Sequence, residues 1–193
     1  MRGWSCVLAA VLLAGVLAPV RAEEVAEPSD YRQDDFRAPV PDTLAGATVV
    51  DTAAAKVLWE AGETVFIDVL PMPPKPKLPP STIFRQPPRD DIPGSTWLPD
   101  VGYGRLNETM TGYFRDGLAA ATGGDKSKPV LFYCLADCWM SWNAARRALE
   151  WGYRTVYWYP DGTDGWTFDD LPVERRKPVP RPEEEPDEEL GAE

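Results

Sequence analysis

One stretch of the sequence decides the fold: Pro129-Val130-Leu131-Phe132-Tyr133 runs directly into Cys134-Leu135-Ala136-Asp137-Cys138-Trp139, and a helix-like pattern follows. The first run is apolar throughout, which predicts a buried strand of a parallel sheet. α/β proteins place their chemistry in the loop between such a strand and the next helix. A cysteine there gains from the free N–H groups and positive end of the helix, which lower the pKa of a thiol. Cys134 and Cys138 are therefore the first candidate site residues.

Strand and helix patterns alternate on both sides of this stretch. Further strands are predicted at Thr48–Val50, Thr64–Val69 and Thr155–Tyr159, and helices at Ala53–Glu60, at about 108–121 and from Trp142 toward Gly152. The first helix is expected to begin with Asp51 or Thr52 as its N-cap and to end at Gly62. A turn is predicted at Pro160-Asp161-Gly162. This alternation predicts an α/β fold, with a central parallel sheet flanked by helices on both faces. Asp68 then lies near the carboxyl end of its strand.

The N-terminus is typical of an export signal. Arg2 precedes an almost unbroken apolar run from Cys6 to Leu17, and Val20-Arg21-Ala22 resembles a cleavage site with small residues. The apolar run is shorter than the roughly 20 residues that a membrane-spanning helix needs. We therefore predict a signal peptide over 1–22, a periplasmic or secreted protein, and no membrane span after cleavage.

The composition divides the remaining chain into three parts. We predict an N-terminal polar extension over 23–45, one domain over 46–171 and a Pro-rich acidic tail over 172–193. Few aliphatic residues occur in 23–41 or in the tail, so we expect weak order in both. The proline-rich stretch Pro71–Pro93 is expected to be a long irregular excursion, because proline interrupts helices and inner strands.

Charge and composition exclude several classes of function. The chain of 193 residues contains no histidine, so Ser-His-Asp or Cys-His catalysis and histidine-containing metal sites are excluded. Its formal net charge is −11, and loss of Arg2 and Arg21 with the signal would make it −13. Such a balance makes nucleic acid an unfavourable partner. It suits solubility, or encounter with a basic protein such as an electron carrier.

The order of these pieces resembles the rhodanese-like domain over most of Thr48 to Leu171. Four landmarks carry the resemblance: Phe66-Ile67-Asp68-Val69, Ile92-Pro93-Gly94-Ser95 with Asp91 in place of the family's histidine, Cys134 at the position of the family's nucleophile, and Gly162-Thr163-Asp164-Gly165-Trp166. The resemblance implies a rhodanese-like α/β fold and a sulfur-handling role.

More narrowly, Phe132 to Arg146 resembles exported proteins named for a Cys...Cys-Trp motif and associated with catabolism by PQQ-dependent alcohol dehydrogenases. That resemblance implies a periplasmic quinoprotein dehydrogenase or an electron carrier as partner. Neither the motif nor the composition implies a resident cofactor or metal. We expect none.

Within the loop, the predicted chemistry uses two sulfurs. Cys134 is the candidate reactive sulfur and Cys138 its resolving partner, since a persulfide or sulfenate on one could be attacked by the other to close a disulfide. Asp68 is expected to brace the strand end, Asp137 to cap the helix and Trp139 to shield the sulfurs or support a substrate. The loop lacks the arginine that an anionic substrate requires, which argues against phosphatase activity and thiosulfate transfer.

Two alternatives stay open from the sequence. A disulfide between the two cysteines could be a permanent staple in an exported binding or assembly factor, without catalysis. Alternatively, Cys134, Cys138 and Met140 could supply three soft sulfur ligands to Cu(I). Thiol–disulfide or sulfur handling, in support of PQQ-dependent alcohol oxidation, is the function that we predict first.

Overall fold

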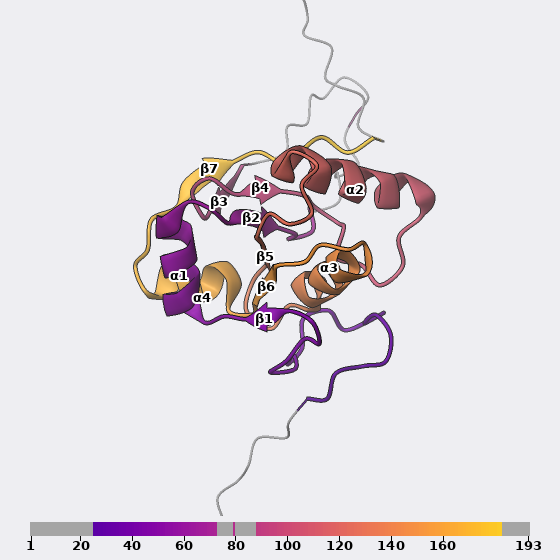
Figure 1. Cartoon of the computed structure of the whole chain (residues 1–193), viewed down its shortest axis with the longest axis horizontal. Helices are drawn as coiled ribbons and strands as arrows, with labels where there is room; N and C mark the ends of the chain where they lie inside the picture. The colour runs from indigo at the N-terminus through magenta and orange to yellow at the C-terminus, as the bar shows by residue number, and fades with distance from the viewer. Residues whose placement is uncertain (1–24, 73–78, 80–87, 183–193) are drawn as a thin grey trace, which may run out of the picture.

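The computed structural model describes residues 25–72, 79 and 88–182, which form a layered α/β fold (Figure 1). In chain order the elements are β1 Thr48–Val49, α1 Thr52–Ala61, β2 Val65–Asp68, β3 Arg89–Asp91, β4 Thr96–Trp97, α2 Glu108–Thr122, β5 Val130–Tyr133, α3 Trp139–Glu150, β6 Val156–Tyr159, α4 Gly162–Phe168 and β7 Glu174–Arg176. Five strands form one parallel sheet in the order β1-β6-β5-β2-β4, and β3 pairs antiparallel with β7.

The predicted fold class is confirmed. Figure 1 shows α1 and α4 on one side of the sheet and α2 and α3 on the other. The side chains of β5 alternate between these two layers, as the pleat of a strand requires. Val130 and Phe132 pack in the core under α2 and α3, whereas Leu131 and Tyr133 pack in the core under α1 and α4. A strand covered on both faces is apolar at every position, and for this reason the apolar run of β5 could be predicted as a buried strand.

The ends of α1 follow directly from the local sequence. Asp51 is the N-cap and its side chain accepts a hydrogen bond from the Ala54 N–H at 2.8 Å. Gly62 closes the helix with a φ of 71°, a left-handed conformation that favours glycine. Both ends agree with the start and stop predicted from the sequence.

Helix α4 is absent from the sequence prediction, which placed only a turn at 160–162. Its seven residues include two glycines and too short an apolar pattern to reveal a helical period. The helix is held by tertiary contact, because the Thr163 N–H donates to the Cys134 carbonyl at 3.0 Å. Gly162, with a φ of 52°, approaches so closely that a Cβ there would lie 2.3 Å from the Cys134 carbonyl oxygen.

The expectation of weak order is wrong for the described parts of both flanking segments. Residues 25–45 lie against α3, and Trp142 Nε1–H donates to the Thr43 carbonyl at 3.2 Å. After Pro172, β7 pairs with β3 and the Val179 N–H donates to the Trp97 carbonyl at 2.9 Å. Polar segments of this kind obtain their order from backbone and side-chain hydrogen bonds, which composition does not reveal.

Some predictions concern residues outside the described ones. They are the signal peptide over 1–22, most of the proline-rich excursion and the acidic end over 183–193. Where that excursion is described, the expectation of an irregular segment is wrong for Arg89–Asp91, because these residues form β3 by pairing with β7. Among residues 25–72, 79 and 88–182, none of the helices is long and apolar enough to cross a bilayer.

We expect Asn107→Ala to lower the free energy of unfolding by about 1 kcal/mol, because the Asn107 side chain caps α2 by accepting from the Met110 N–H. Urea denaturation followed by circular dichroism measures the change. Asn107→Ser keeps a capping oxygen and should lose much less. Equal losses in both variants would contradict the capping role.

Candidate functional site

Cys134 and Cys138 form a disulfide at the carboxyl edge of the sheet. Cys134 directly follows β5, and Cys138 is the N-cap residue of α3. Their Cα atoms are 6.2 Å apart, within the range that disulfides span. Both residues are buried, with exposed fractions of 0% and 2%. The structure therefore brings together the two sulfurs singled out from the sequence, and in this conformation neither faces solvent.

Asp137 does not cap α3, so that part of the prediction is wrong. The N-cap position belongs to Cys138, which makes no side-chain capping hydrogen bond. Asp137 is exposed and has a φ of 50°, which places it at the bend of the loop. The loop is instead held by Asp164 of α4, whose Oδ2 accepts from the Ala136 N–H at 3.0 Å.

Several carboxylates surround this bend. Burial raises the pKa of Asp161, and the negative charges of Asp51, Asp137 and Asp169 raise it further. Asp51 follows β1, Asp137 follows β5 and Asp161 follows β6, so parallel strands deliver acidic residues to the same edge as the disulfide. An anionic substrate would meet like charge here.

Trp139 is buried and lies over the disulfide end of α3, where it makes directional contacts. Its backbone N–H donates to the Phe36 carbonyl at 2.9 Å, and its indole N–H donates to the Pro39 carbonyl at 3.1 Å. The Arg32 guanidinium lies 5.2 Å from its ring centroid. Trp139 thus attaches the N-terminal segment to the first turn of α3.

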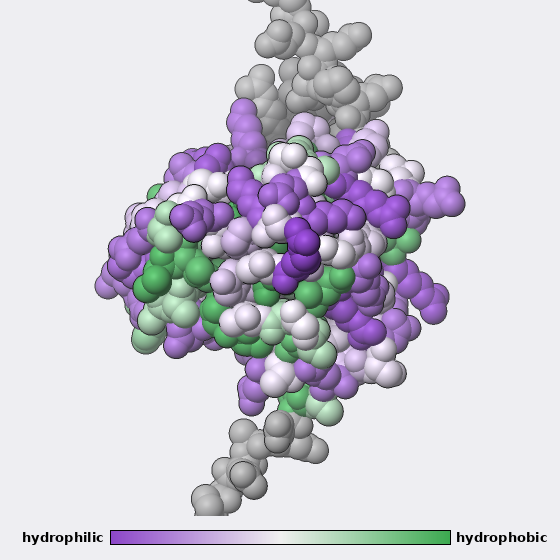
Figure 2. Space-filling view, viewed as in Figure 1, coloured by the Kyte–Doolittle hydropathy of each residue, from purple (hydrophilic) through white to green (hydrophobic). Residues whose placement is uncertain are grey.

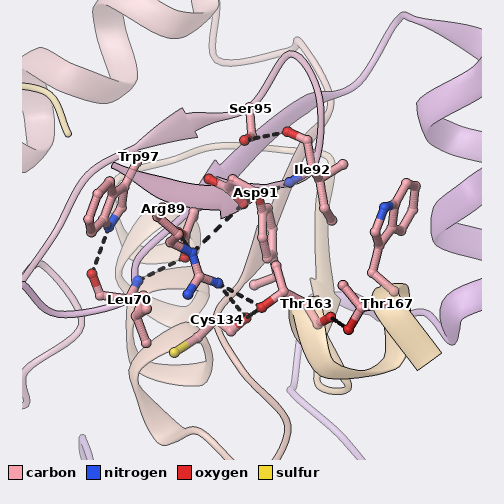
Figure 3. Close-up of polar contacts among 12 residues, drawn as sticks. Leu70, Arg89, Asp91, Ile92, Ser95, Trp97, Cys134, Thr163 and Thr167 are labelled. Atoms are coloured by element: carbon pink, nitrogen blue, oxygen red, sulfur yellow. Dashed lines mark hydrogen bonds and ion pairs between the residues drawn. The ribbon is translucent and has the colours of Figure 1, made fainter. Parts of the chain in front are cut away.

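A buried ionic cluster lies beside Cys134 (Figure 3). Asp68 and Asp91 are both fully buried, and Arg89 lies with its Nε 2.7 Å from Asp68 Oδ2 and 4.0 Å from Asp91 Oδ1. The shorter contact is an ion pair without the angle of a hydrogen bond. The Tyr133 hydroxyl donates to Asp91 Oδ1 at 2.5 Å, and the Leu70 N–H donates to Asp68 Oδ1 at 2.9 Å. Asp68 is therefore the strand-end brace predicted from the sequence.

This cluster holds two carboxyl groups against one guanidinium. Burial raises the pKa of Asp68 well above its ordinary value, the nearby Asp91 charge raises it further, and Arg89 acts in the opposite direction. The Oδ2 atoms of Asp68 and Asp91 have no hydrogen-bond partner among the described residues. A proton on Asp68 would remove one of the two negative charges that face Arg89.

Arg89 connects the cluster to the cysteine loop, and sequence reasoning missed it. Its Nη2 donates to Thr163 Oγ1 at 2.7 Å and reaches the Cys134 carbonyl at 3.5 Å. The sequence contains no signal for this role, because Arg89 lies 45 residues before Cys134 on a three-residue strand. Since Arg89 is committed to Asp68 and Thr163, it does not supply the anion-binding fork that the loop lacks.

The described residues provide no cluster of metal-binding carboxylates and thiols at the sulfurs. Within 25–72, 79 and 88–182, no group of three or more Cys, Asp or Glu side chains could hold a metal ion. Met140 is buried in the core, and its backbone lies against Gly102. One groove of about 450 Å³ lies between α2 and Val179–Pro182, away from the cysteines.

Comparison with known proteins gave matches among solved structures alone, because no protein family and no curated protein matches the sequence. A homodimeric polysulfide-sulfur transferase from Wolinella succinogenes is 19% identical over 68% of this chain and 81% of that chain, with a TM-score of 0.43. A full-length protein from Lactobacillus plantarum is 22% identical over 66% and 88% of the two chains, with a TM-score of 0.41.

EanB, in a structure that holds a cysteine persulfide and ergothioneine, is 21% identical over 75% of this chain and 35% of that chain, with a TM-score of 0.48. These proteins are similar to this chain at low identity. The chemistry of this chain therefore has to come from its own residues.

We expect Asp68→Asn to flatten the pH dependence of stability. The folded protein binds a proton at the carboxyl pair more tightly than the unfolded chain does, so wild-type stability should fall as the pH rises from about 4 through the raised pKa of Asp68. The variant lacks this proton and should gain stability relative to wild type toward neutral pH. Denaturant titrations between pH 4 and 8 measure the difference, with Asp42→Asn, at an exposed position, as control. Parallel curves for wild type and Asp68→Asn would contradict the raised pKa of Asp68.

Proposed function

We propose that this protein is an exported rhodanese-like protein whose Cys134–Cys138 pair carries out thiol–disulfide exchange or related sulfur handling. The observation that carries the proposal is the disulfide across the loop between the central strand β5 and helix α3. That loop holds two sulfurs and lacks the arginine fork and histidine base of other chemistries. Two neighbouring cysteine sulfurs can pass between disulfide and dithiol by exchanging two electrons with a partner thiol pair, and no further group is needed.

The reaction must balance electrons and protons. A partner dithiol would supply two electrons and two protons, its own sulfurs would form a disulfide, and Cys134 and Cys138 would become thiols. The reverse reaction would oxidise the partner. The export that we propose is consistent with this chemistry, because a disulfide persists outside the cytosol and its redox state can then be coupled to that of a partner.

For the partner we propose a periplasmic quinoprotein dehydrogenase or an electron carrier with a basic face. The acidic residues Asp51, Asp161 and Asp164 lie at the same edge of the fold as the cysteine loop. A basic protein would be steered toward this edge by long-range attraction. Support of PQQ-dependent alcohol oxidation is the cellular role that we propose on this basis.

A second candidate function is a non-catalytic binding or assembly factor whose disulfide is structural. Burial of both sulfurs favours it, and so does the exposed apolar surface on α1 and α4. Val57 is 64% exposed and Phe168 is 87% exposed. Figure 2 shows hydrophobic residues gathered over this side of the molecule. An apolar surface flanked by carboxylates suits the binding of another protein.

The redox potential of the pair separates these candidates. We expect mature protein to equilibrate in a series of glutathione buffers, with a potential above about −300 mV, because structural disulfides in exported proteins lie below that value. Thiol trapping resolved by mass spectrometry counts the free thiols, and Cys134→Ser and Cys138→Ser serve as controls that cannot close the ring.

Other outcomes would overturn the proposal. A pair that stays oxidised until the protein unfolds would identify a structural disulfide and favour the binding factor. A pair that never oxidises would leave the sulfurs available to Cu(I), and stoichiometric Cu(I) binding lost in both serine variants would then establish that alternative.

A further inference from the structure

The two sulfurs of the disulfide are covered by different kinds of structure. Cys134 follows the central strand β5 and is held by contacts with β3 and α4. Its carbonyl accepts from the Thr163 N–H at 3.0 Å and is reached by Arg89 at 3.5 Å, and Leu135 forms a bridge with Gly162. A Cβ at Gly162 would overlap the Cys134 carbonyl, so the two segments have no room to shift. Exposing Cys134 would require opening the core.

Cys138 is covered by a peripheral segment, residues 25–40, which we name the N-terminal strap. Arg37 forms an antiparallel bridge with Cys138, and the next residue, Trp139, donates through its backbone N–H to the Phe36 carbonyl. The Phe36 ring in turn packs edge-on against Tyr103, with centroids 5.3 Å apart.

The strap contacts the domain through side chains that are at most partly buried, and Val25, Phe36, Ala38 and Val40 among them pack against the core. None of its sixteen residues is buried, and the first buried position along the described chain is Pro41. Tyr31 lies over Arg147, with the guanidinium 4.1 Å from the ring centroid, and its hydroxyl contacts Glu150. The Arg32 N–H donates to Asn143 Oδ1 at 2.9 Å. A segment without a fully buried residue opens locally more readily than the core strands and helices do.

We propose that the N-terminal strap controls access to the disulfide and that Cys138 is the sulfur attacked first by an incoming thiolate. This inference rests on the proposed function. The sequence alone favoured Cys134 as the first reactive sulfur because it follows the strand. The two sulfurs belong to one core, but the bridge with Arg37 places Cys138 directly beside the strap.

The proposed step balances as follows. With the strap lifted, one thiolate of a partner dithiol attacks Cys138 Sγ, a mixed disulfide forms between them, and the Cys134–Cys138 bond breaks with its electron pair on Cys134 Sγ. The Cys134 thiolate takes a proton from water. The partner's second thiolate, which has released its own proton to water, then attacks the mixed disulfide, and Cys138 leaves as a thiolate that is protonated in turn.

The first test places the mixed disulfide. Wild-type protein is treated with reduced glutathione, quenched in acid at early times and digested, and mass spectrometry locates the glutathione. We expect the early adduct on Cys138 at least tenfold more often than on Cys134. An excess on Cys134, or equal amounts, would overturn the assignment.

The second test loosens the strap at a distance from the sulfurs. Tyr31→Ala removes the contacts with Arg147 and Glu150, and it should raise the rate of disulfide reduction by dithiothreitol several-fold while the potential of the pair stays the same. Trp139→Phe, which loses the bond to the Pro39 carbonyl, should act in the same direction. An unchanged rate in both variants would overturn the role of the strap.

The matched control is Trp59→Phe. Trp59 also donates through its indole N–H to a proline carbonyl, that of Pro93 at 2.8 Å, but it lies on α1 away from the strap. Its reduction rate should equal that of wild type, and an increase as large as that of Trp139→Phe would count against the strap. Failure of this inference is distinct from failure of the proposed function. A reversible potential together with first attack on Cys134 would overturn the inference about Cys138 and the strap, and it would leave the proposed thiol–disulfide function intact.

Discussion

Arg89 lies between two buried carboxyl groups, and the carboxyl edge of the sheet is built around that contact. Asp68 ends β2, while Arg89 and Asp91 belong to β3, which is not part of the main sheet. Burying a carboxylate without a partner would be strongly unfavourable, and burial of Asp68 beside Asp91 raises the pKa of Asp68 well above its ordinary value in spite of Arg89. The contact therefore couples the structure of this edge to the protonation of its buried carboxyl groups. The hydrogen bond from Arg89 to Thr163 connects the same cluster to α4.

The same cluster explains why the cysteine loop has its observed form. Tyr133 points into the layer under α1 and α4 and binds Asp91, so the next residue, Cys134, enters the opposite layer. The carbonyl of Cys134 stays on the side of Arg89 and Thr163 while its side chain bonds Cys138. One end of the disulfide thus belongs to the rigid sheet and the other to the beginning of a helix.

The cover over the helix end comes from a segment that composition identified as polar and weakly ordered. Its order arises from partners far along the chain, among them Asn143 and Arg147, which are buried themselves and direct their polar groups to backbone carbonyls or to Tyr31. Redox chemistry at a buried disulfide requires such a removable cover, because a thiolate must reach the sulfur along the S–S axis.

Local chemistry was enough for the sequence to determine several parts of this protein. The apolar runs of β2, β5 and β6 identified the strands, Asp51 and Gly62 marked the ends of α1, and two cysteines at a strand–helix junction marked the site. Each of these signals acts within a few residues of the structure it predicts.

Tertiary structure alone decided the rest. Arg89 contacts the carbonyl of a cysteine 45 residues away, and α4 depends on contact with the same carbonyl. The N-cap of α3 is Cys138, although the sequence predicted Asp137. The position of the N-terminal strap is likewise fixed by its contacts with α3. These features depend on which distant groups meet and on which buried charges must be neutralised, and a linear pattern does not contain that information.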